Sequence, residues 1–292
     1  MDDGTRRLYE LHSRPELDRP VLVMAPDGWI DAGLGGTTAL ASLLSTMATE
    51  VIATFDADDL LDHRARRPMS HIVDGVYADL IWPSIELRAG SDGHGHDVLV
   101  LSGPEPDHRW RAFAGAVTGL AQEFGVRLLV GLGAFPAPVP HTRTATLAAS
   151  ATTAELANRV GIVPGRVEVP AGVLSAVSAR FAEIEVPAIG LWARVPHYAA
   201  GMPYPEAAVL LLDGLADLAG IVVDATELRE AAQATRRQLD ELTANSPQHS
   251  ALVQQLEAQA DAEAENASGW GQLPTGDELA AELEKFLRGE TQ

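Results

Sequence analysis

Short apolar runs, bounded by turns and separated by helical stretches, constrain the fold of this chain most. Four of them lie at residues 21–25 (VLVMA), 51–55 (VIATF), 128–132 (LLVGL) and 188–193 (AIGLWA). Runs of this length are typical of strands buried on both faces, as in parallel sheets that helices cover. An Ala/Leu-rich helical stretch separates the first two runs and predicts a βαβ unit. The sequence therefore indicates an α/β fold.

Other segments indicate a sheet that is not purely parallel. Apolar residues alternate with others between residues 79 and 88, and a glycine-rich turn at 90–95 leads to the run at 98–101. This pattern predicts an antiparallel hairpin. A helix follows Pro106, with Gly125 at its end, and another spans residues 205–219. We therefore predict a mixed, mostly parallel central sheet flanked by helices.

The character of the sequence changes after residue 223. The remaining residues include fourteen acidic and five basic side chains, a net charge of −9, and no strand-like run. Leu228, Thr235 and Leu242 form a heptad-like stripe, which Pro247 ends. A second acidic helix is predicted near 250–265, and a capping-box pattern at 275–278 predicts a last helix. The predicted domains are an α/β core at 1–223 and an acidic helical extension at 224–292.

Charge and composition exclude several kinds of partner. The 292 residues include 41 acidic and 21 basic side chains, a net charge of −20. This balance disfavours binding to nucleic acid or to anionic membrane surfaces. Cysteine is absent, which excludes disulfides and thiolate metal sites. Neither a secretory signal nor a membrane span is visible, so a cytoplasmic location is expected.

Polar residues gather in loops that follow the predicted strands. Ligands of open α/β sheets bind beyond the carboxyl ends of the strands, so these loops form the candidate pocket. Its residues are Asp27, Trp29, Asp31, Glu105, Asp107, His141, Arg143, His197 and Tyr198. No catalytic residue is assigned among them, because no nucleophile with a partner base is visible.

Each of these features has a structural interpretation beside the functional one. Glu105 and Asp107 suit acid/base chemistry, but also the capping of the helix that follows them. His141 and Arg143 suit an anionic ligand, or hydrogen bonds that fix their own proline-rich loop at 133–143. His94 and His96 lie in a glycine-rich turn where side chains are usually solvated. No metal site and no cofactor is expected.

A basic segment at residues 62–68 (DHRARRP) stands out in this acidic chain. Arg64, Arg66 and Arg67 suit an acidic partner or ion pairs with carboxylates of a neighbouring subunit. We favour the second interpretation, and regard these arginines as a candidate interface.

Five separated strings stand out in the sequence: LLDHRARRP (60–68), LSGPEPDHRW (101–110), GLGAFPAPVPHTR (131–143), VPHY (195–198) and ELAAELEKFLRG (278–289). Together they resemble the PAC2 family, the proteasome assembly chaperone 2 family, in its actinobacterial branch. The resemblance implies a core similar to nucleoside phosphorylases and hydrolases, a helical C-terminal extension and homotrimers. It also implies proteasome subunits or other proteins as partners. It supplies no agreed catalytic residues.

Two functional hypotheses follow. The first is a non-enzymatic, chaperone-like assembly protein, which the resemblance and the missing catalytic constellation favour. The second is a protein that binds or cleaves a small molecule such as a nucleoside or glycoside in the strand-end crevice. A ligand-sized polar cavity between the loops would favour the second, and a filled surface the first.

Overall fold

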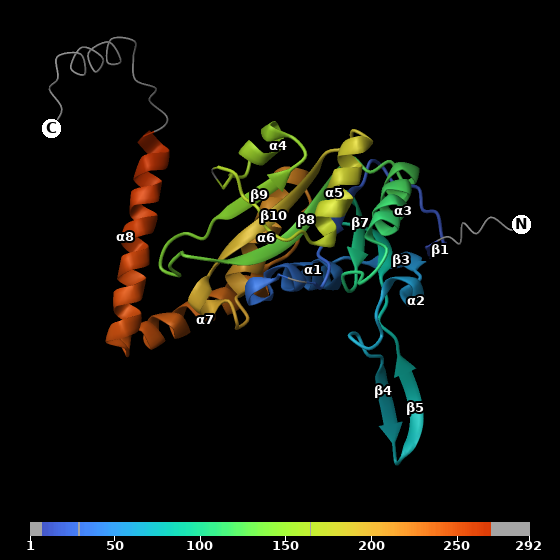
Figure 1. Cartoon of the computed structure of the whole chain (residues 1–292), viewed down its shortest axis with the longest axis horizontal. Helices are drawn as coiled ribbons and strands as arrows, with labels where there is room; N and C mark the ends of the chain where they lie inside the picture. The colour runs from blue at the N-terminus through green and yellow to red at the C-terminus, as the bar shows by residue number, and fades with distance from the viewer. Residues whose placement is uncertain (1–7, 29, 164, 270–292) are drawn as a thin grey trace, which may run out of the picture.

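The computed structural model describes residues 8–28, 30–163 and 165–269. Its centre is an eight-stranded sheet with the strand order β1-β3-β6-β7-β2-β8-β10-β9 (Figure 1). The strands are β1 (Tyr9–Leu11), β2 (Val21–Met24), β3 (Thr49–Phe55), β6 (Glu86–Ser91), β7 (Asp97–Ser102), β8 (Leu128–Ala137), β9 (Leu147–Ala151) and β10 (Ala188–Pro196).

The sheet is mixed, with a parallel centre. Strands β7, β2, β8 and β10 run parallel to one another, whereas β1, β3, β6 and β9 join through antiparallel pairs. In β2, Val21 and Val23 face one apolar cluster while Leu22 and Met24 face the other. A strand covered on both faces needs apolar side chains at every position. The predicted α/β class with a mixed sheet is confirmed.

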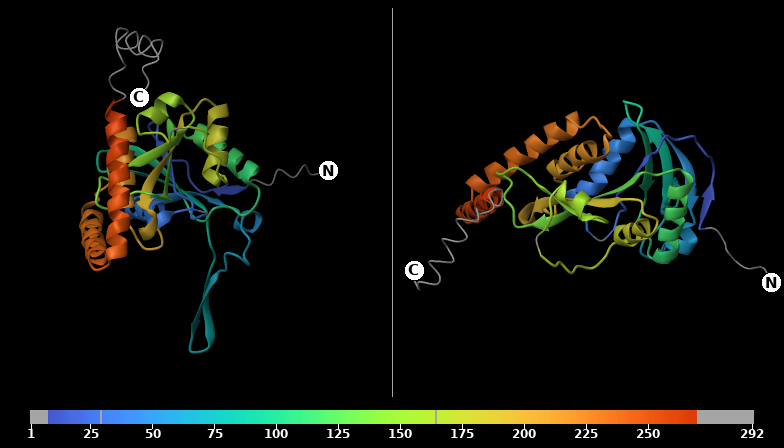
Figure 2. Two further views of the ribbon diagram at one scale, coloured as in Figure 1. Left: turned by 60° about the vertical axis from the view of Figure 1, so that its left-hand side comes forward. Right: turned by 90° about the horizontal axis from the view of Figure 1, so that it is seen from above.

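Helices cover both faces of the sheet (Figure 2). Helices α1 (Gly35–Thr46) and α6 (Pro205–Ala219) pack on one face, and α3 (Trp110–Glu123) and α5 (Val173–Glu183) on the other. The short elements are η1 (Ala32–Leu34), α2 (Ala57–Leu60), α4 (Ala154–Asn158) and η2 (His197–Ala199). The result is a three-layer α/β/α body.

Each of the two helices expected from the sequence, α3 and α6, is followed by a glycine with a positive φ. Helix α3 buries Phe113, Val117 and Leu120, and Gly125 follows it with a φ of 67°. Helix α6 begins at Pro205 and ends before Gly220, whose φ is 75°. A left-handed residue at this position is the usual helix terminator, and glycine adopts it without strain.

The structure differs from the sequence expectation in the strands. Strand β3 runs in the same direction as β2, but β7 and β6 lie between them, so the expected βαβ pair is not adjacent. Strand β6, the antiparallel partner of β7, begins at Glu86, whereas the sequence pattern predicted a strand from residue 79. Strand β8 continues to Ala137, because β10 pairs with it as far as Pro196. The proline-rich loop is correspondingly shorter.

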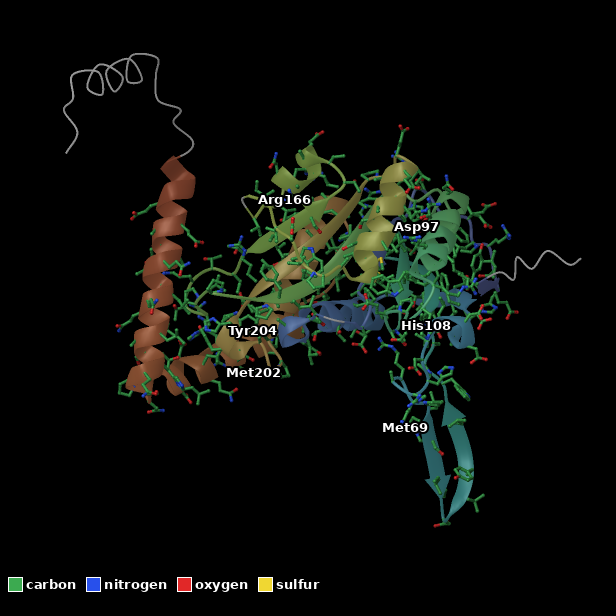
Figure 3. The ribbon with its side chains drawn as sticks, in the orientation of Figure 1. Met69, Asp97, His108, Arg166, Met202 and Tyr204 are labelled. Atoms are coloured by element: carbon green, nitrogen blue, oxygen red, sulfur yellow. The ribbon has the colours of Figure 1, made fainter. Side chains whose placement is uncertain are left out.

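Residues 69–81 form a separate two-stranded hairpin that extends from the body (Figure 1). Its strands are β4 (Met69–Val73) and β5 (Val76–Ile81), which are antiparallel. All residues of both strands are exposed. Met69 lies at the end nearer the body (Figure 3). We call residues 69–82 the arm. Of the segment predicted to alternate, residues 79–81 therefore belong to the arm and residues 86–88 to β6 of the central sheet.

Two helices follow the α/β body. Helix α7 (Thr226–Ala244) packs against α6, and its Leu239 belongs to the core cluster on that face. Helix α8 (Pro247–Gly269) stands at one side of the body (Figures 1 and 2). Pro247 ends the first helix as expected, and α8 runs through part of the predicted linker. A domain boundary at residue 224 stays a prediction. The predicted helix after the capping box at 275–278 lies outside the described residues.

Candidate functional site

The loops after β2 and β7 are bound directly to each other. The Asp27 amide donates to the Gly103 carbonyl at 3.1 Å, and the Glu105 amide donates to the Asp27 carbonyl at 2.8 Å. These contacts continue the parallel pairing of β2 and β7 beyond the strand ends. The candidate loops that hold Asp27 and Glu105 therefore meet at the carboxyl ends of neighbouring parallel strands. Trp29 lies outside the described residues.

The Glu105 carboxylate is buried and points at the start of α5. Its Oε1 accepts the Val173 amide at 2.6 Å, and the residue is 9% exposed. A Cβ on Gly28 would approach Glu105 Oε2 to 2.7 Å, so the first loop packs closely on this side chain. A carboxylate at a helix N-terminus is stabilised by the unpaired amides there. The capping role is therefore present, but for α5 rather than for α3.

Replacing Glu105 with alanine is expected to lower the free energy of unfolding by about 2 kcal/mol, because it leaves a buried amide without an acceptor. Glu105→Gln keeps an oxygen acceptor and loses only the charge, so about 1 kcal/mol is expected. Urea denaturation measures both values. An alanine variant as stable as the native protein would contradict the capping role.

Two further carboxylates of these loops, Asp31 and Asp107, also accept hydrogen bonds from backbone amides. Asp31 accepts the Gly36 amide at 2.7 Å and the Thr37 amide at 2.9 Å. It thereby caps α1, whose first residues have no other acceptor for these groups. Asp107 accepts the Asp62 amide at 2.8 Å. Asp31 therefore holds the start of α1, and Asp107 joins its own loop to the segment at Asp62.

The basic segment lies beside Asp107. Arg66 Nε donates to Asp107 Oδ2 at 3.2 Å. Arg64 and Arg67 are exposed. One of the three candidate interface arginines is therefore used within the chain, and the other two face solvent.

The space beside the joined loops is small and mainly apolar. A void of about 10 Å³ lies there, roughly enough for one water molecule. Its lining residues are Met24, Pro26, Ile85, Leu101, Ser102, Gly103, Pro104, Pro106, Phe113 and Val173. A void of this size does not hold a nucleoside or a sugar.

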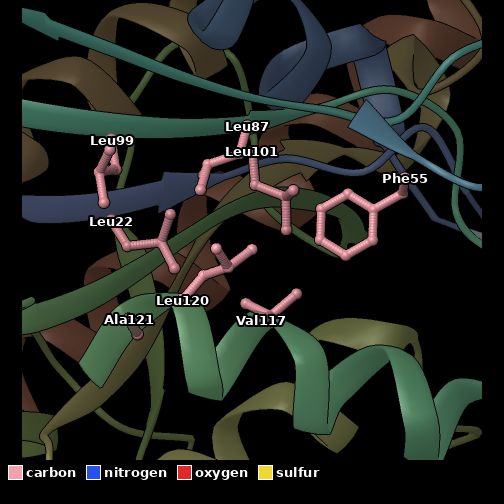
Figure 4. Close-up of a pocket in the computed structure, with 8 residues that line it drawn as sticks. All are labelled: Leu22, Phe55, Leu87, Leu99, Leu101, Val117, Leu120 and Ala121. Atoms are coloured by element: carbon pink, nitrogen blue, oxygen red, sulfur yellow. The ribbon is translucent and has the colours of Figure 1, made fainter. Parts of the chain in front are cut away.

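A second void lies inside the core between the sheet and α3 (Figure 4). It also measures about 10 Å³. Its lining is entirely apolar: Leu22, Phe55, Leu87, Leu99, Leu101, Val117, Leu120 and Ala121. A void with this lining offers no polar group to orient a substrate. We interpret it as a packing defect of the core.

His141 lies in a different place, between the body and α7. Its amide donates to Tyr198 Oη at 2.8 Å, and its Nδ1 lies 2.6 Å from the same oxygen. Its Nε2 lies 3.2 Å from Asp240 Oδ1. A neutral ring satisfies all three contacts when the tyrosine hydroxyl donates to Nδ1 and the Nε2–H donates to Asp240. His141 is thereby part of a buried hydrogen-bond chain.

Burial favours the neutral forms of His141 and Tyr198 in this hydrogen-bond network. It lowers the pKa of His141 from its ordinary value, and the Asp240 carboxylate offsets this only in part. Burial also raises the pKa of Tyr198, which favours the neutral hydroxyl. His197 is exposed, and its ring contacts that of Tyr198 edge-on. The two candidate histidines are therefore joined through Tyr198 rather than facing one pocket.

The two residues after His141 contact α8. Thr142 Oγ1 donates to Glu257 Oε1 at 2.5 Å. Arg143 donates from Nε and Nη2 to the two carboxylate oxygens of Asp261 at 2.8 and 2.9 Å, and from Nη1 to Glu257 at 3.0 Å. Sequence reasoning found Arg143 but not its partners. The i, i+4 spacing of two carboxylates in an acidic helix was the available signal.

Asp92 is a further buried carboxylate that the sequence did not single out. Its carboxylate accepts hydrogen bonds from the backbone amides of His94 and His96, both at 2.9 Å. It also contacts the ring Nδ1 of His96 at 2.9 Å and accepts a hydrogen bond from the Val222 amide at 3.1 Å. Burial alone would raise its pKa, but these bonds hold the pKa well below its ordinary value. Asp92 thus joins the β6–β7 turn to the chain after α6.

In the described ranges, no group of three or more His, Asp or Glu side chains is arranged to hold a metal ion. Of the helices in that part of the chain, none is both long and apolar enough to cross a membrane.

Solved structures of other proteins are similar to this α/β fold. A protein of unknown function from Corynebacterium glutamicum is 32% identical, with a TM-score of 0.83, over 89% of this chain and 99% of its own. A second, from Mycobacterium tuberculosis, is 34% identical with a TM-score of 0.83, over 92% of this chain and 93% of its own. No curated protein matches the sequence.

The family follows from two further matches. A model of the PAC2 family matches residues 25–243. A proteasome-assembly chaperone homologue from Mycobacterium tuberculosis is 31% identical, with a TM-score of 0.74, over 80% of this chain and 99% of its own. The chain belongs to the PAC2 family. The resemblance seen in the sequence is thereby confirmed.

Proposed function

We propose that this PAC2 protein is a non-enzymatic assembly protein of the cytoplasm, which forms a homotrimer and binds other proteins, proteasome subunits among them. Its likeness to a proteasome-assembly chaperone homologue supports the class of activity. The observation that carries the proposal is the arm, because it presents a large apolar surface that suits contact with another protein chain.

The exposed apolar side chains of the arm are numerous. They are Met69, Ile72, Val73, Val76, Tyr77, Leu80, Ile81 and Trp82, each 47–79% exposed. Together they present roughly 1,000 Å², at least as much as one partner buries in a standard interface and more than monomers usually expose. The arm is therefore large enough to be an interface by itself.

Both faces of the arm are apolar. Adjacent residues of a strand point to opposite faces, and Ile72–Val73, Val76–Tyr77 and Leu80–Ile81 are all adjacent apolar pairs. A two-stranded hairpin is marginal in water without further packing. The arm thus needs covering on two sides, which suits insertion between surfaces of neighbouring subunits.

Charge at the root of the arm supports contact between copies of this acidic chain. Two copies, each with a net charge of −20, repel one another. Arg64 and Arg67 are exposed just before β4 and would pair with carboxylates of the neighbouring subunit. We expect Arg64→Glu/Arg67→Glu to weaken the trimer, most strongly at low salt.

The oligomer is tested with two matched double variants. Native mass spectrometry should show a mass three times the 30.9 kDa of one chain. Val76→Asp/Tyr77→Asp places charges on both faces of the arm and should yield monomers. Val167→Asp/Val169→Asp alters residues of comparable exposure elsewhere and should leave the trimer intact. A native protein that is monomeric at micromolar concentration would refute the trimer.

The partner is tested separately. Affinity purification of the native protein from a proteasome-bearing host should recover proteasome subunits. The arm variant Val76→Asp/Tyr77→Asp serves as the comparison. If proteasome subunits are undetected with the trimeric native protein, the assembly role at the proteasome is wrong, whatever the oligomeric state.

A further inference from the structure

Helix α8 is bound to the α/β body by a cluster of polar and charged side chains. The contacts run from Thr142 and Arg143 to Glu257 and Asp261, at 2.5–3.0 Å. The two carboxylates lie four residues apart, hence on one face of the helix. Arg143 binds Asp261 with two parallel N–H groups, the geometry that gives arginine its specificity for carboxylates. We call these four residues the ionic clasp.

Two buried apolar side chains hold α8 together with the ionic clasp. Val253 and Leu256 are buried, at 5% and 4% exposure, yet neither belongs to the two core clusters. The side chains of the clasp remain in contact with water: Arg143 is 41% exposed and Asp261 55%. Ion pairs of this kind weaken as salt screens them. The attachment is therefore sensitive to conditions that leave the core unchanged.

Helix α7 is attached differently. Its Leu239 lies in the core cluster, and Arg229 forms an ion pair with Asp213 of α6. The two helices are separated at Asn245–Ser246, before Pro247 begins α8. Pro247 donates no backbone hydrogen bond, so the helical hydrogen-bond series is interrupted there. The chain thus contains a hinge between α7, whose Leu239 joins the core cluster, and α8, whose buried residues lie outside both clusters.

We propose that α8 is a releasable helix. The ionic clasp holds it against the body, and it rotates away about Asn245–Pro247 when the clasp opens. This device goes beyond the proposed assembly function. Release exposes the acidic face of α8 and frees Arg143 and Thr142 together. High ionic strength opens the clasp, and so does any partner that competes for Arg143 or for the two carboxylates.

Hydrogen exchange of the full-length protein at one pH and temperature tests the device. A free helix of this kind is marginal in water, so its amides exchange faster after release. Arg143→Asp converts attraction into repulsion, and we expect peptides from residues 250–265 to exchange about tenfold faster. Raising the salt to about 1 M, where screening acts within ~3 Å, should produce the same change in the native protein.

Two controls isolate the clasp. Peptides from α7 should keep their protection in Arg143→Asp. Arg180→Ala removes an arginine of comparable exposure whose partner, Glu183, lies on its own helix, and it should leave α8 unchanged. The exchanged pair Arg143→Asp/Asp261→Arg restores opposite charges and should recover most of the lost protection.

Three results would overturn the proposal. One is an α8 exchange rate that is the same in the native protein and in Arg143→Asp. Another is an equal rise in α7, which would mean that the two helices open as one unit. The third is an exchanged-pair variant that remains as unprotected as Arg143→Asp, because attraction between positions 143 and 261 would then not hold the helix.

Discussion

Replacing Asp92 with alanine should lower the free energy of unfolding by about 3 kcal/mol, since it removes a buried carboxylate that accepts four hydrogen bonds. The lost bonds are those from His94, His96 and Val222. Urea denaturation at pH 7 measures the change. Asp97→Ala is the control in the same hairpin: its carboxylate accepts an exposed amide, so a loss below about 1 kcal/mol is expected.

The pH dependence of this effect has a definite sign. The pKa of Asp92 is lower in the folded protein than its ordinary value of 3.8, so the unfolded chain binds the proton more readily. The stabilisation from Asp92 is therefore fully present above pH 3.8 and is lost as the pH falls below it. The stability difference between the native protein and Asp92→Ala should narrow in that range. A constant difference would show that the charge of Asp92 is unimportant.

Replacing Gly103 with alanine should be at least as damaging. Gly103 has a φ of 121°, which side-chain-bearing residues rarely adopt, and a Cβ would lie 2.3 Å from the Ser84 carbonyl oxygen. Backbone strain and overpacking together should cost roughly 4 kcal/mol. Thermal unfolding monitored by circular dichroism measures the change.

The matched control for Gly103 lies in α3. A Cβ on Gly119 meets nothing within 4 Å, and the residue is helical. Gly119→Ala should therefore stabilise the protein by about 0.5–1 kcal/mol, because alanine has the higher helix propensity. If both alanine variants were neutral, the packing around Gly103 would be looser than the structure indicates.

The sequence predicted the body of this fold well, because burial on both faces leaves a continuous apolar run. Strand β2 and helix α6 begin within a residue of the expected positions for that reason. The arm was not predicted. The pattern from residue 79 predicts one strand of the central sheet, and nothing local to residues 69–82 reveals that the core leaves them uncovered.

The candidate site was predicted in part. The loops of Asp27 and Glu105 meet because parallel neighbouring strands end together, a rule that needs only the strand assignment. His141 and Arg143 instead bind Asp240, Glu257 and Asp261, about a hundred residues further along the chain. Such contacts depend on where a later helix is placed, which periodicity does not encode.

The position of β2 in the sheet has a consequence for how the protein is made. This strand is synthesised early, yet its two neighbours in the sheet are β7 and β8. Val21 therefore cannot pair until Val98 and Leu128 have been synthesised. During translation, a wholly apolar segment therefore remains without its sheet partners for much of the chain. Such topologies fold slowly and expose nascent chains to misassembly. A protein that we propose assists the assembly of others should itself depend on protection at the ribosome.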